Sequence, residues 1–268
     1  MRVFSIQRRI YIIFFNCYMN VFKSLVVWIM VSCFIVVMFP ITFMIWLLVL
    51  PFDKKRIVTH WLLMHQGFLL CWIIPVWKIV VEGREKAFRG QTYIIISNHQ
   101  SMLDIVLIFY LRYRFKSVSK IENTKIPVLG WYIRMADYIT VDRVNEQSKS
   151  GMLDKSLKCL KDGTSIMIFP EGTRANGNEI GRFKRGAFLL AIQAECPILP
   201  VLIDGTGGIL PKNGLIFAWG KRIKIRVLDP VQPSSFGTKD NDELALKLRS
   251  LMNSELKKSR ANRSNNDI

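Results

Sequence analysis

The N-terminal part of the chain is dominated by apolar residues. From Ser24 to Phe52 there are 29 consecutive positions without a charged side chain, rich in Val, Ile, Leu, Met, Phe and Trp. A helix needs roughly 20 apolar residues to cross a bilayer, so this run predicts a membrane-inserted helix. Pro40 lies in its middle and is expected to kink or split that helix. The run is too long for the apolar segment of a cleavable signal peptide, about 7–15 residues, and no small-residue cleavage site follows it.

A second uncharged run extends from Ile57 to Trp77, but His65, Gln66 and Pro75 interrupt it. Three tryptophans have the spacing of aromatic anchors at a membrane interface: Trp61, Trp72 and Trp77. We therefore expect a helix that lies in the interface; the alternative is a buried helix of the protein core. Basic residues flank the first run on both sides, so two full spans would place one cluster on the disfavoured face. A hairpin that dips into one leaflet avoids that conflict and is the predicted arrangement.

Beyond residue 78 the pattern changes to short β-branched runs that alternate with amphipathic stretches of helical length. The predicted strands are Lys78–Glu82, Thr92–Ser97, Lys116–Ser119, Tyr138–Val141, Ser165–Phe169, Ile198–Ile203 and Ile223–Leu228. The predicted helices between them are Met102–Leu111, Val128–Met135, Glu146–Leu160 and Arg185–Ala194. This alternation predicts an α/β fold with a largely parallel central sheet flanked by helices, preceded by the hydrophobic two-helix membrane motif.

The chain therefore divides into three predicted parts. Residues 1–77 form the membrane-associated helices, residues 78–233 the α/β domain, and residues 234–268 a C-terminal segment. That segment is expected to contain an amphipathic helix over about 240–258. A polar tail follows whose composition is typical of a disordered region.

Composition narrows the partners of the protein. The 268 residues include 38 Lys and Arg against 20 Asp and Glu, a formal charge of +18, which favours acidic partners. No helix-turn-helix, zinc finger or RNA-binding aromatic pattern is present, so anionic membrane is the predicted partner, not nucleic acid. The five cysteines include no CxxC pair and are predicted to be reduced, buried thiols of a protein that faces the cytosol. The three histidines have no metal-ligand spacing.

Polar and charged residues follow four of the predicted strands. Asn98 and His99 follow one strand, Lys120 a second, Arg143 a third, and the segment Pro170–Arg174 a fourth. In open α/β sheets ligands bind at the carboxyl ends of the strands. If these strands are parallel, a histidine, a nearby aspartate and three basic groups meet at one edge. Such a group is suited to activating a hydroxyl beside a bound phosphate.

His99 lies in the segment Asn-His-Gln-Ser-Met-Leu-Asp, which leaves a strand and enters a helix. Ser101 is expected to cap that helix, which places Asp104 in its first turn. A carboxylate there can accept the proton of one imidazole nitrogen, fix the tautomer and leave the other nitrogen as a base. The alternative is a histidine that only caps the helix.

Further along, residues 169–174 read Phe-Pro-Glu-Gly-Thr-Arg, and residues 183–188 read Phe-Lys-Arg-Gly-Ala-Phe. Here the chain resembles the glycerolipid acyltransferase family, especially the lysophosphatidic acid acyltransferases. The family's Asn-His, four residues and Asp are matched by Asn98, His99 and Asp104, and its Phe-Pro-Glu-Gly-Thr-Arg block is unchanged. Looser matches lie at Lys120, Pro127, Gly130, Tyr138–Arg143 and Pro197–Val201. The resemblance covers about residues 80–230.

The resemblance implies that His99 takes the proton of an acceptor hydroxyl as it attacks a thioester carbonyl, while Asp104 orients the imidazole. Attack would be direct, and no cysteine lies in a motif with a paired histidine. The residues implied to bind substrate are Lys120, Arg143, Glu171, Gly172, Thr173 and Arg174. Among them Arg174, Lys120 and Arg143 would hold the acceptor phosphate, Arg174 through its two-pronged donors. Glu171 and Gly172 would shape the loop. The alternative for these residues is an ordinary turn with solvated basic side chains.

The implied reaction moves a fatty acyl group from acyl-CoA or an acyl carrier protein thioester to the sn-2 hydroxyl of 1-acylglycerol-3-phosphate, giving phosphatidic acid. No bound cofactor or metal is expected. Membrane lipids, the lysophospholipid acceptor and the acyl donor are the predicted partners, with the catalytic domain on the cytoplasmic face. Two alternatives remain: an acyltransferase of the same family that uses another lysophospholipid or an aminolipid, and a non-catalytic membrane lipid-binding protein. The stretch Gly205–Gly208 lacks the Lys-Ser/Thr of a P-loop and is interpreted as a loop at the rim of the site.

Overall fold

The computed structural model describes residues 2–74, 77–175, 179–238 and 240–266. Pro75, predicted to interrupt the second apolar run, lies outside them. The α-helices are α1 Arg2–Val49, α2 Ile57–Ile73, α3 Leu103–Leu107, α4 Leu129–Met135, α5 Glu146–Lys161, α6 Gly186–Gln193, α7 Thr206–Ile209 and α8 Asn241–Asn266. The short 3-10 helices are η1 Arg84–Lys86, η2 Ile108–Leu111, η3 Ile121–Lys125 and η4 Pro233–Phe236. The strands are β1 Trp77–Glu82, β2 Ile94–Ser97, β3 Phe115–Lys120, β4 Ile139–Val141, β5 Ser165–Ile168, β6 Ile198–Asp204 and β7 Lys221–Val227.

The strands form one sheet in the order β1-β7-β6-β2-β5-β3-β4. The five strands from β6 to β4 are mutually parallel. Strand β7 pairs with β6 in the antiparallel sense and with β1 in the parallel sense, so β1 and β7 run opposite to the rest. Each predicted strand is present within two residues of its expected bounds, and the predicted α/β fold with a largely parallel sheet is confirmed.

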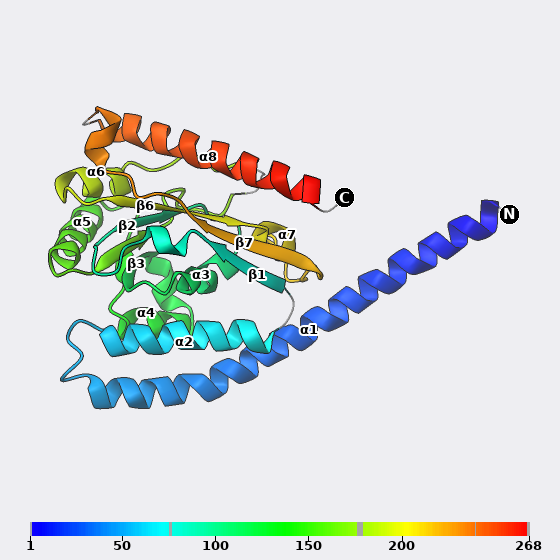
Figure 1. The fold of residues 1–268 in the computed structure, drawn as a ribbon. Helices are drawn as coiled ribbons and strands as arrows, with labels where there is room; N and C mark the ends of the chain where they lie inside the picture. The colour runs from blue at the N-terminus through cyan, green and yellow to red at the C-terminus, as the bar shows by residue number, and fades with distance from the viewer. Residues whose placement is uncertain (1, 75–76, 176–178, 239, 267–268) are drawn as a thin grey trace.

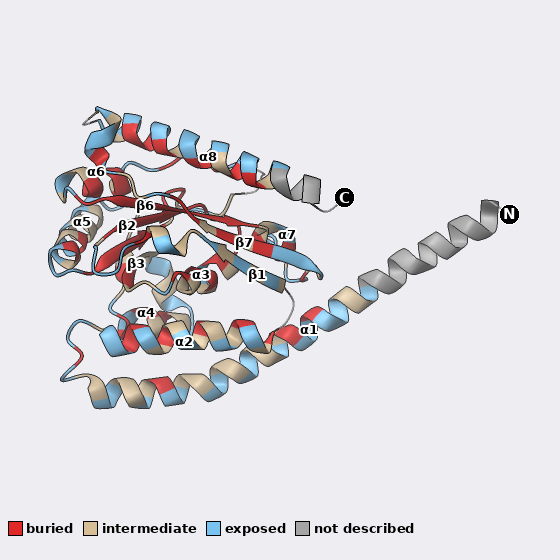
Figure 2. Ribbon diagram, viewed as in Figure 1, coloured by how far each residue is buried: buried red, intermediate tan, exposed pale blue. Residues whose placement is uncertain are grey.

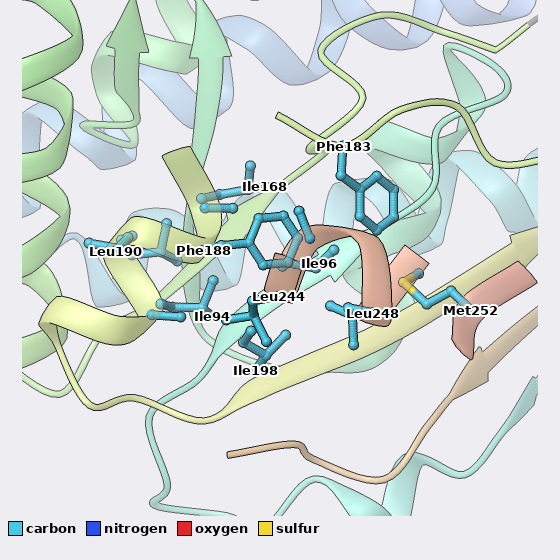
Figure 3. Packing of buried hydrophobic residues seen from close by; sticks show 14 of the residues in the cluster. Ile94, Ile96, Ile168, Phe183, Phe188, Leu190, Ile198, Leu244, Leu248 and Met252 are labelled. Carbon is cyan, nitrogen blue, oxygen red and sulfur yellow. The ribbon is translucent and has the colours of Figure 1, made fainter. Parts of the chain in front are cut away.

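Both faces of the sheet are apolar and covered, which is why the central strands are nearly continuous runs of apolar residues. Successive side chains of a strand point to opposite faces. Ile95 therefore joins a core cluster with α2, α3 and η2, whereas Ile94 and Ile96 join a second cluster. Figure 3 shows this second cluster, in which Phe188 of α6 and Leu244 of α8 pack against the isoleucines of β2.

Helix α8 completes that second core. Its buried residues recur at helical spacing: Leu244, Ala245, Leu248, Met252 and Leu256. The prediction of a disordered tail after Lys258 is wrong for the described part of that tail, because α8 continues to Asn266. The reason is a long-range ion pair. The Arg260 guanidinium donates to Asp204 Oδ1 at the end of β6, with Nη2 at 2.7 Å and Nε at 3.0 Å.

Helix α1 is not split at Pro40. It is one helix that bends along its length and leaves the α/β domain toward its N-terminus (Figure 1). The segment Tyr18–Val49 is long and apolar enough to cross a membrane, by length and composition. Figure 2 shows burial concentrated in the sheet and on the helix faces turned toward it, whereas much of α1 is exposed or half-buried. Exposed apolar side chains on α1 include Phe22, Ile29, Val36 and Leu48.

Helix α2 lies between α1 and the α/β domain (Figure 1). Its buried face includes His60, Leu63 and Cys71, so the helix combines the two predicted alternatives: one side belongs to the core, and Trp61 and Trp72 are exposed on the other. Trp77 is not an exposed interfacial anchor. It begins β1, and its ring packs against Phe217 with centroids 6.0 Å apart.

Candidate active site

The candidate site lies where four parallel strands end. Strands β2, β5, β3 and β4 are neighbours in the sheet and point the same way, so their carboxyl ends share one edge. His99 follows β2, the segment Pro170–Arg174 follows β5, Lys120 ends β3, and Arg143 follows β4. The predicted gathering of these residues at one edge is therefore what the topology produces.

Asn98 fixes the direction in which the chain leaves β2. Its buried side-chain amide donates from Nδ2 to the Ile203 carbonyl at 2.8 Å and accepts from the Ile203 amide at Oδ1, at 2.9 Å. The asparagine thus continues the pairing of β2 with β6 through its side chain. His99 follows with its ring stacked on Phe169, at 4.3 Å between centroids and 25° between planes. The side chain of His99 is 15% exposed, enough for a substrate atom to reach the ring.

Asp104 is fully buried and holds the imidazole. The Nδ1 atom of His99 lies 2.8 Å from Asp104 Oδ2. The same oxygen accepts from the backbone amides of Gln100 at 2.6 Å and Ser101 at 2.8 Å. These two amides keep the carboxylate in place whether or not the ring is bound. With Nδ1 turned toward a carboxylate, Nε2 is the ring nitrogen left to act as a base.

Ser101 contacts the start of helix α3, but its role as a cap is weak. The helix begins at Leu103, whose amide donates to Ser101 Oγ at 3.4 Å, and the residue before it, Met102, has helical backbone angles. The Ser101 hydroxyl also donates to the Leu210 carbonyl at 2.8 Å, because this buried turn packs against the segment that follows α7. Asp104 Oδ2 accepts from the backbone amides of Gln100 and Ser101, which precede the helix.

Glu171 joins the two motifs. Its Oε1 accepts from the backbone amide of His99 at 2.8 Å, and its Oε2 accepts from the backbone amide of Gly181, also at 2.8 Å. The Ala175 amide donates to the His99 carbonyl at 2.8 Å, which closes the loop onto the same residue. Burial raises the pKa of Glu171, while the amides of His99 and Gly181 act to lower it. Both oxygens are engaged by the protein, so in this structure Glu171 positions the loop; direct substrate binding by it stays a prediction.

Two cations converge on Gly172. Arg143 Nη1 donates to the Gly172 carbonyl, and the Lys184 side chain lies over its Cα, so that a Cβ there would be 2.8 Å from Lys184 Cε. Gly172 also has a φ of +69°, which glycine adopts without strain. Burial and the nearby charges of Arg143 and Lys149 lower the pKa of Lys184. Lys184 was absent from the predicted binding residues, although its motif, Phe-Lys-Arg-Gly, offered the signal.

The remaining predicted residues line the outer part of this edge. Lys120 forms an ion pair with Glu122, 2.7 Å from Nζ to Oε1, and the charge of Arg143 also acts on Glu122. Thr173 is exposed and Arg174 is half-buried. Among the residues that the structure describes, Arg174 has no ion pair or side-chain hydrogen bond, so its guanidinium is available to an anion.

This arrangement brings together a histidine, a buried carboxylate and several cations. No group of three His, Cys, Asp or Glu side chains comes together as metal ligands among the described residues. A buried carboxylate orients His99, and Arg143, Lys184 and Arg174 supply positive charge along the same edge. The fold and site together define an α/β protein with a histidine–aspartate pair beside a cationic rim, formed by Lys120, Arg143, Arg174 and Lys184.

Comparison with known proteins identifies the family. A family model described as Acyltransferase matches residues 78–204. A 1-acyl-sn-glycerol-3-phosphate acyltransferase of Saccharomyces cerevisiae is 34% identical over 209 residues, 76% of this chain and 68% of the yeast protein. The crystal structure of a 1-acyl-sn-glycerophosphate acyltransferase, PlsC, from Thermotoga maritima has a TM-score of 0.75 at 25% identity, over 90% of this chain and 96% of that one. The chain belongs to the acyltransferase family.

Some relatives are considerably longer. A 1-acyl-sn-glycerol-3-phosphate acyltransferase of Chlamydomonas reinhardtii is 33% identical over 168 residues, 62% of this chain and 50% of its own length. The chain spans about half the length, or less, of its Chlamydomonas reinhardtii, Arabidopsis thaliana and Brassica napus relatives.

Proposed function

We propose that this protein is a 1-acylglycerol-3-phosphate O-acyltransferase, which transfers a fatty acyl group from a thioester to the sn-2 hydroxyl and forms phosphatidic acid. The observation that carries the proposal is the pair of His99 and fully buried Asp104, 2.8 Å apart, at a sheet edge that also bears cations. The names of the yeast and algal relatives and of the Thermotoga structure support the same substrate and reaction.

In the first step, Nε2 of His99 accepts the proton of the acceptor hydroxyl. The hydroxyl oxygen forms a bond to the thioester carbonyl carbon, and the carbonyl oxygen takes up the negative charge of a tetrahedral intermediate. The imidazolium that results is stabilised by Asp104, whose buried carboxylate already faces Nδ1. General-base catalysis of this kind contributes typically ~10²–10⁴ in rate.

In the second step the intermediate collapses. The bond between carbon and sulfur breaks, the thiolate leaves, and the proton held on Nε2 passes to sulfur. An ester and a free thiol are the products, and His99 returns to its neutral form. No covalent acyl-enzyme forms, so a nucleophilic cysteine is not required.

The acceptor phosphate binds the cationic rim. Arg174 has no partner among the described residues and presents a planar fork that fits phosphate oxygens. Arg143 and Lys184, which both contact Gly172, add positive charge beside Arg174. Lys120 lies at the outer end of the same rim. Burial lowers the pKa of Arg143, and an anionic ligand compensates for that loss of solvation.

The acyl donor is acyl-CoA or an acyl carrier protein thioester, and membrane lipids supply the acceptor. Apolar helix α1 and the exposed tryptophans of α2 support attachment to a bilayer. The catalytic domain faces the cytoplasm, where both kinds of donor occur.

The test is an acylation assay with the purified full chain in detergent micelles. The acceptor is 1-acylglycerol-3-phosphate or another lysophospholipid, and each is paired with acyl-CoA and with acyl carrier protein thioester. Phosphatidic acid should form fastest, and His99→Ala should slow its formation by ~10²–10⁴. The matched control is His65→Ala, which removes an exposed histidine of α2. Preference for another lysophospholipid would overturn the acceptor assignment, and near wild-type turnover by His99→Ala would overturn the mechanism.

A further inference from the structure

A cavity of about 810 Å³ lies at the edge of the sheet opposite to His99. It is formed by η1 and the loop before β2, by the turn between η2 and β3, and by the start of β5. The site edge begins where β2 and β5 end, so the length of a four-residue strand, roughly 13 Å, separates the two. The volume is within the range of sites for small ligands, about 300–1,000 Å³.

The lining of this cavity is strongly basic. It includes four arginines and one acidic residue: Arg84, Arg89, Arg112, Arg114 and Glu85. None of the four arginines forms an ion pair among the residues that the structure describes. Burial and the neighbouring Arg112 guanidinium lower the pKa of Arg84, so these two positive charges lie close together in a lining that has one carboxylate, that of Glu85.

Three of the guanidinium groups are held in place by the protein. Arg84 Nη2 donates to the Tyr110 carbonyl at 2.7 Å, and Arg114 Nη2 donates to Thr164 Oγ1 at 2.7 Å. The Arg112 guanidinium lies over the ring of Phe68 on α2, 5.3 Å from its centroid. Each guanidinium has five N–H groups, so these contacts leave donors for a ligand. Pre-positioned donors lose less conformational freedom when a ligand binds.

Two donors of the lining residues are also unsatisfied. Arg84 Nε and the Tyr113 hydroxyl are buried without a hydrogen-bond partner among the described residues. Buried donors without acceptors are unfavourable, so this wall is short of acceptor atoms. Fixed guanidiniums with N–H groups to spare and an excess of positive charge are together complementary to an anion with several oxygens.

We propose that this cavity is a second anion site, which binds a phosphate-bearing group away from the reacting atoms. A phospholipid headgroup and a free phosphate compound present the same chemistry to the arginines. The same arginines contact the apolar helices, since Arg112 rests on Phe68 of α2 and Arg114 Nη2 lies 3.5 Å from the Lys55 carbonyl between α1 and α2. A bound anion would therefore be linked to these helices through the arginines.

The experiment compares the full chain in neutral detergent micelles with the variant Arg89→Gln/Arg112→Gln. Both side chains are exposed, so their replacement leaves the core unchanged. Binding of pyrophosphate and of dihexanoyl phosphatidylglycerol is titrated by calorimetry in separate arms. All titrations use an Arg174→Ala background, because the proposed function assigns a phosphate to the other edge. Arg174→Ala is present in both proteins that are compared, so the result does not depend on whether Arg174 binds the acceptor phosphate.

Each lost charge-assisted hydrogen bond is expected to weaken binding roughly ten- to hundredfold. The double variant should therefore lose at least about tenfold in affinity for a probe, whereas Lys257→Gln/Lys258→Gln on α8, which removes the same charge, should bind as before. If the double variant loses affinity only for phosphatidylglycerol, the natural ligand is a lipid headgroup. If it loses affinity only for pyrophosphate, the natural ligand is a soluble phosphate compound. Unchanged affinity for both probes, or an equal loss in the α8 variant, overturns the proposal. If the double variant is unfolded before any ligand is added, the single variant Arg89→Gln takes its place in the titrations.

Discussion

Replacing Asp104 by asparagine separates the charge of this residue from its hydrogen bonds. In the wild type, Oδ2 accepts from His99 Nδ1, from the Gln100 amide and from the Ser101 amide. Oδ1 is buried and has no partner among the described residues. The two backbone amides would repel an amide NH₂ at the Oδ2 position, so asparagine is expected to keep its oxygen there. His99 then retains its tautomer and orientation, and the negative charge is lost.

The expected loss in kcat follows from the neutral hydrogen bond that remains between the introduced asparagine and His99. Hydrogen bonds to charged groups contribute about 1.5–3 kcal/mol and neutral ones about 0.5–1.5 kcal/mol. The difference of about 1–2 kcal/mol would be lost when His99 becomes an imidazolium, which corresponds to roughly 5- to 30-fold in kcat. His99→Ala, which removes the base, should lose ~10²–10⁴. Asp104→Asn is therefore expected to lie clearly between wild type and His99→Ala.

The assay measures kcat and KM for both substrates with purified protein in micelles, together with thermal unfolding. The KM for the acceptor should change little in Asp104→Asn, because Asp104 does not touch the phosphate in this arrangement. Asp104→Ala is the comparison that exposes a folding effect, since it leaves the Gln100 and Ser101 amides buried and unpaired, at about 1–3 kcal/mol each. A kcat for Asp104→Asn equal to that of His99→Ala would refute the retained tautomer. Wild-type kcat would refute any role for the charge.

Three further changes probe the loop, the rim and the membrane helices. In Glu171→Gln the side-chain NH₂ must face the backbone amide of His99 or of Gly181, which leaves that amide without an acceptor. The free energy of unfolding should therefore fall by about 1–3 kcal/mol, measured by thermal unfolding, and kcat should fall with it. Arg174→Ala should raise the KM for the acceptor roughly ten- to hundredfold while the KM for the donor stays constant. Arg174→Lys should recover part of the lost acceptor affinity, and replacement of the exposed Arg182 by alanine should leave both KM values unchanged. A changed KM for the donor would assign Arg174 to donor binding. Neither 1 M salt, where the Debye length is about 3 Å, nor alkaline carbonate should release the protein from membranes, and release by salt alone would mean that α1 is not inserted.

The fold was predictable because local pattern and topology agree in this chain. The buried strands β2, β5 and β6 are short runs of apolar residues bounded by polar turns, and each is covered on both faces. Parallel strands joined by helices have their carboxyl ends at one edge, so His99, Lys120, Arg143 and the loop at 170–174 could be expected together without knowledge of any contact. The pairing of His99 with Asp104 was also predictable, because only five positions separate them.

Contacts between distant segments were not predictable from pattern. The Lys184 side chain covers Gly172 because the chain after Gly181 turns back under the site, and no periodicity reports that return. The length of α8 depends in the same way on Arg260 reaching Asp204, more than fifty residues earlier. The Ser101 hydroxyl likewise donates to the Leu210 carbonyl, a partner more than a hundred residues later that the local pattern does not indicate. In each case the partner lies far away in the sequence.

Glu171 connects the histidine motif at 98–104 with the Phe-Pro-Glu-Gly-Thr-Arg segment at 169–174. The histidine motif supplies the base, but the position of its backbone depends on a carboxylate that comes from the loop after β5. The same loop carries Gly172, whose positive φ and missing Cβ let Lys184 and Arg143 approach, and Arg174, whose guanidinium faces no partner among the described residues. The loop that sets the base therefore also sets the cations. A shift of this loop would disturb the backbone of His99 and the placement of the cations together, so the proposed base and the proposed phosphate site depend on the same segment.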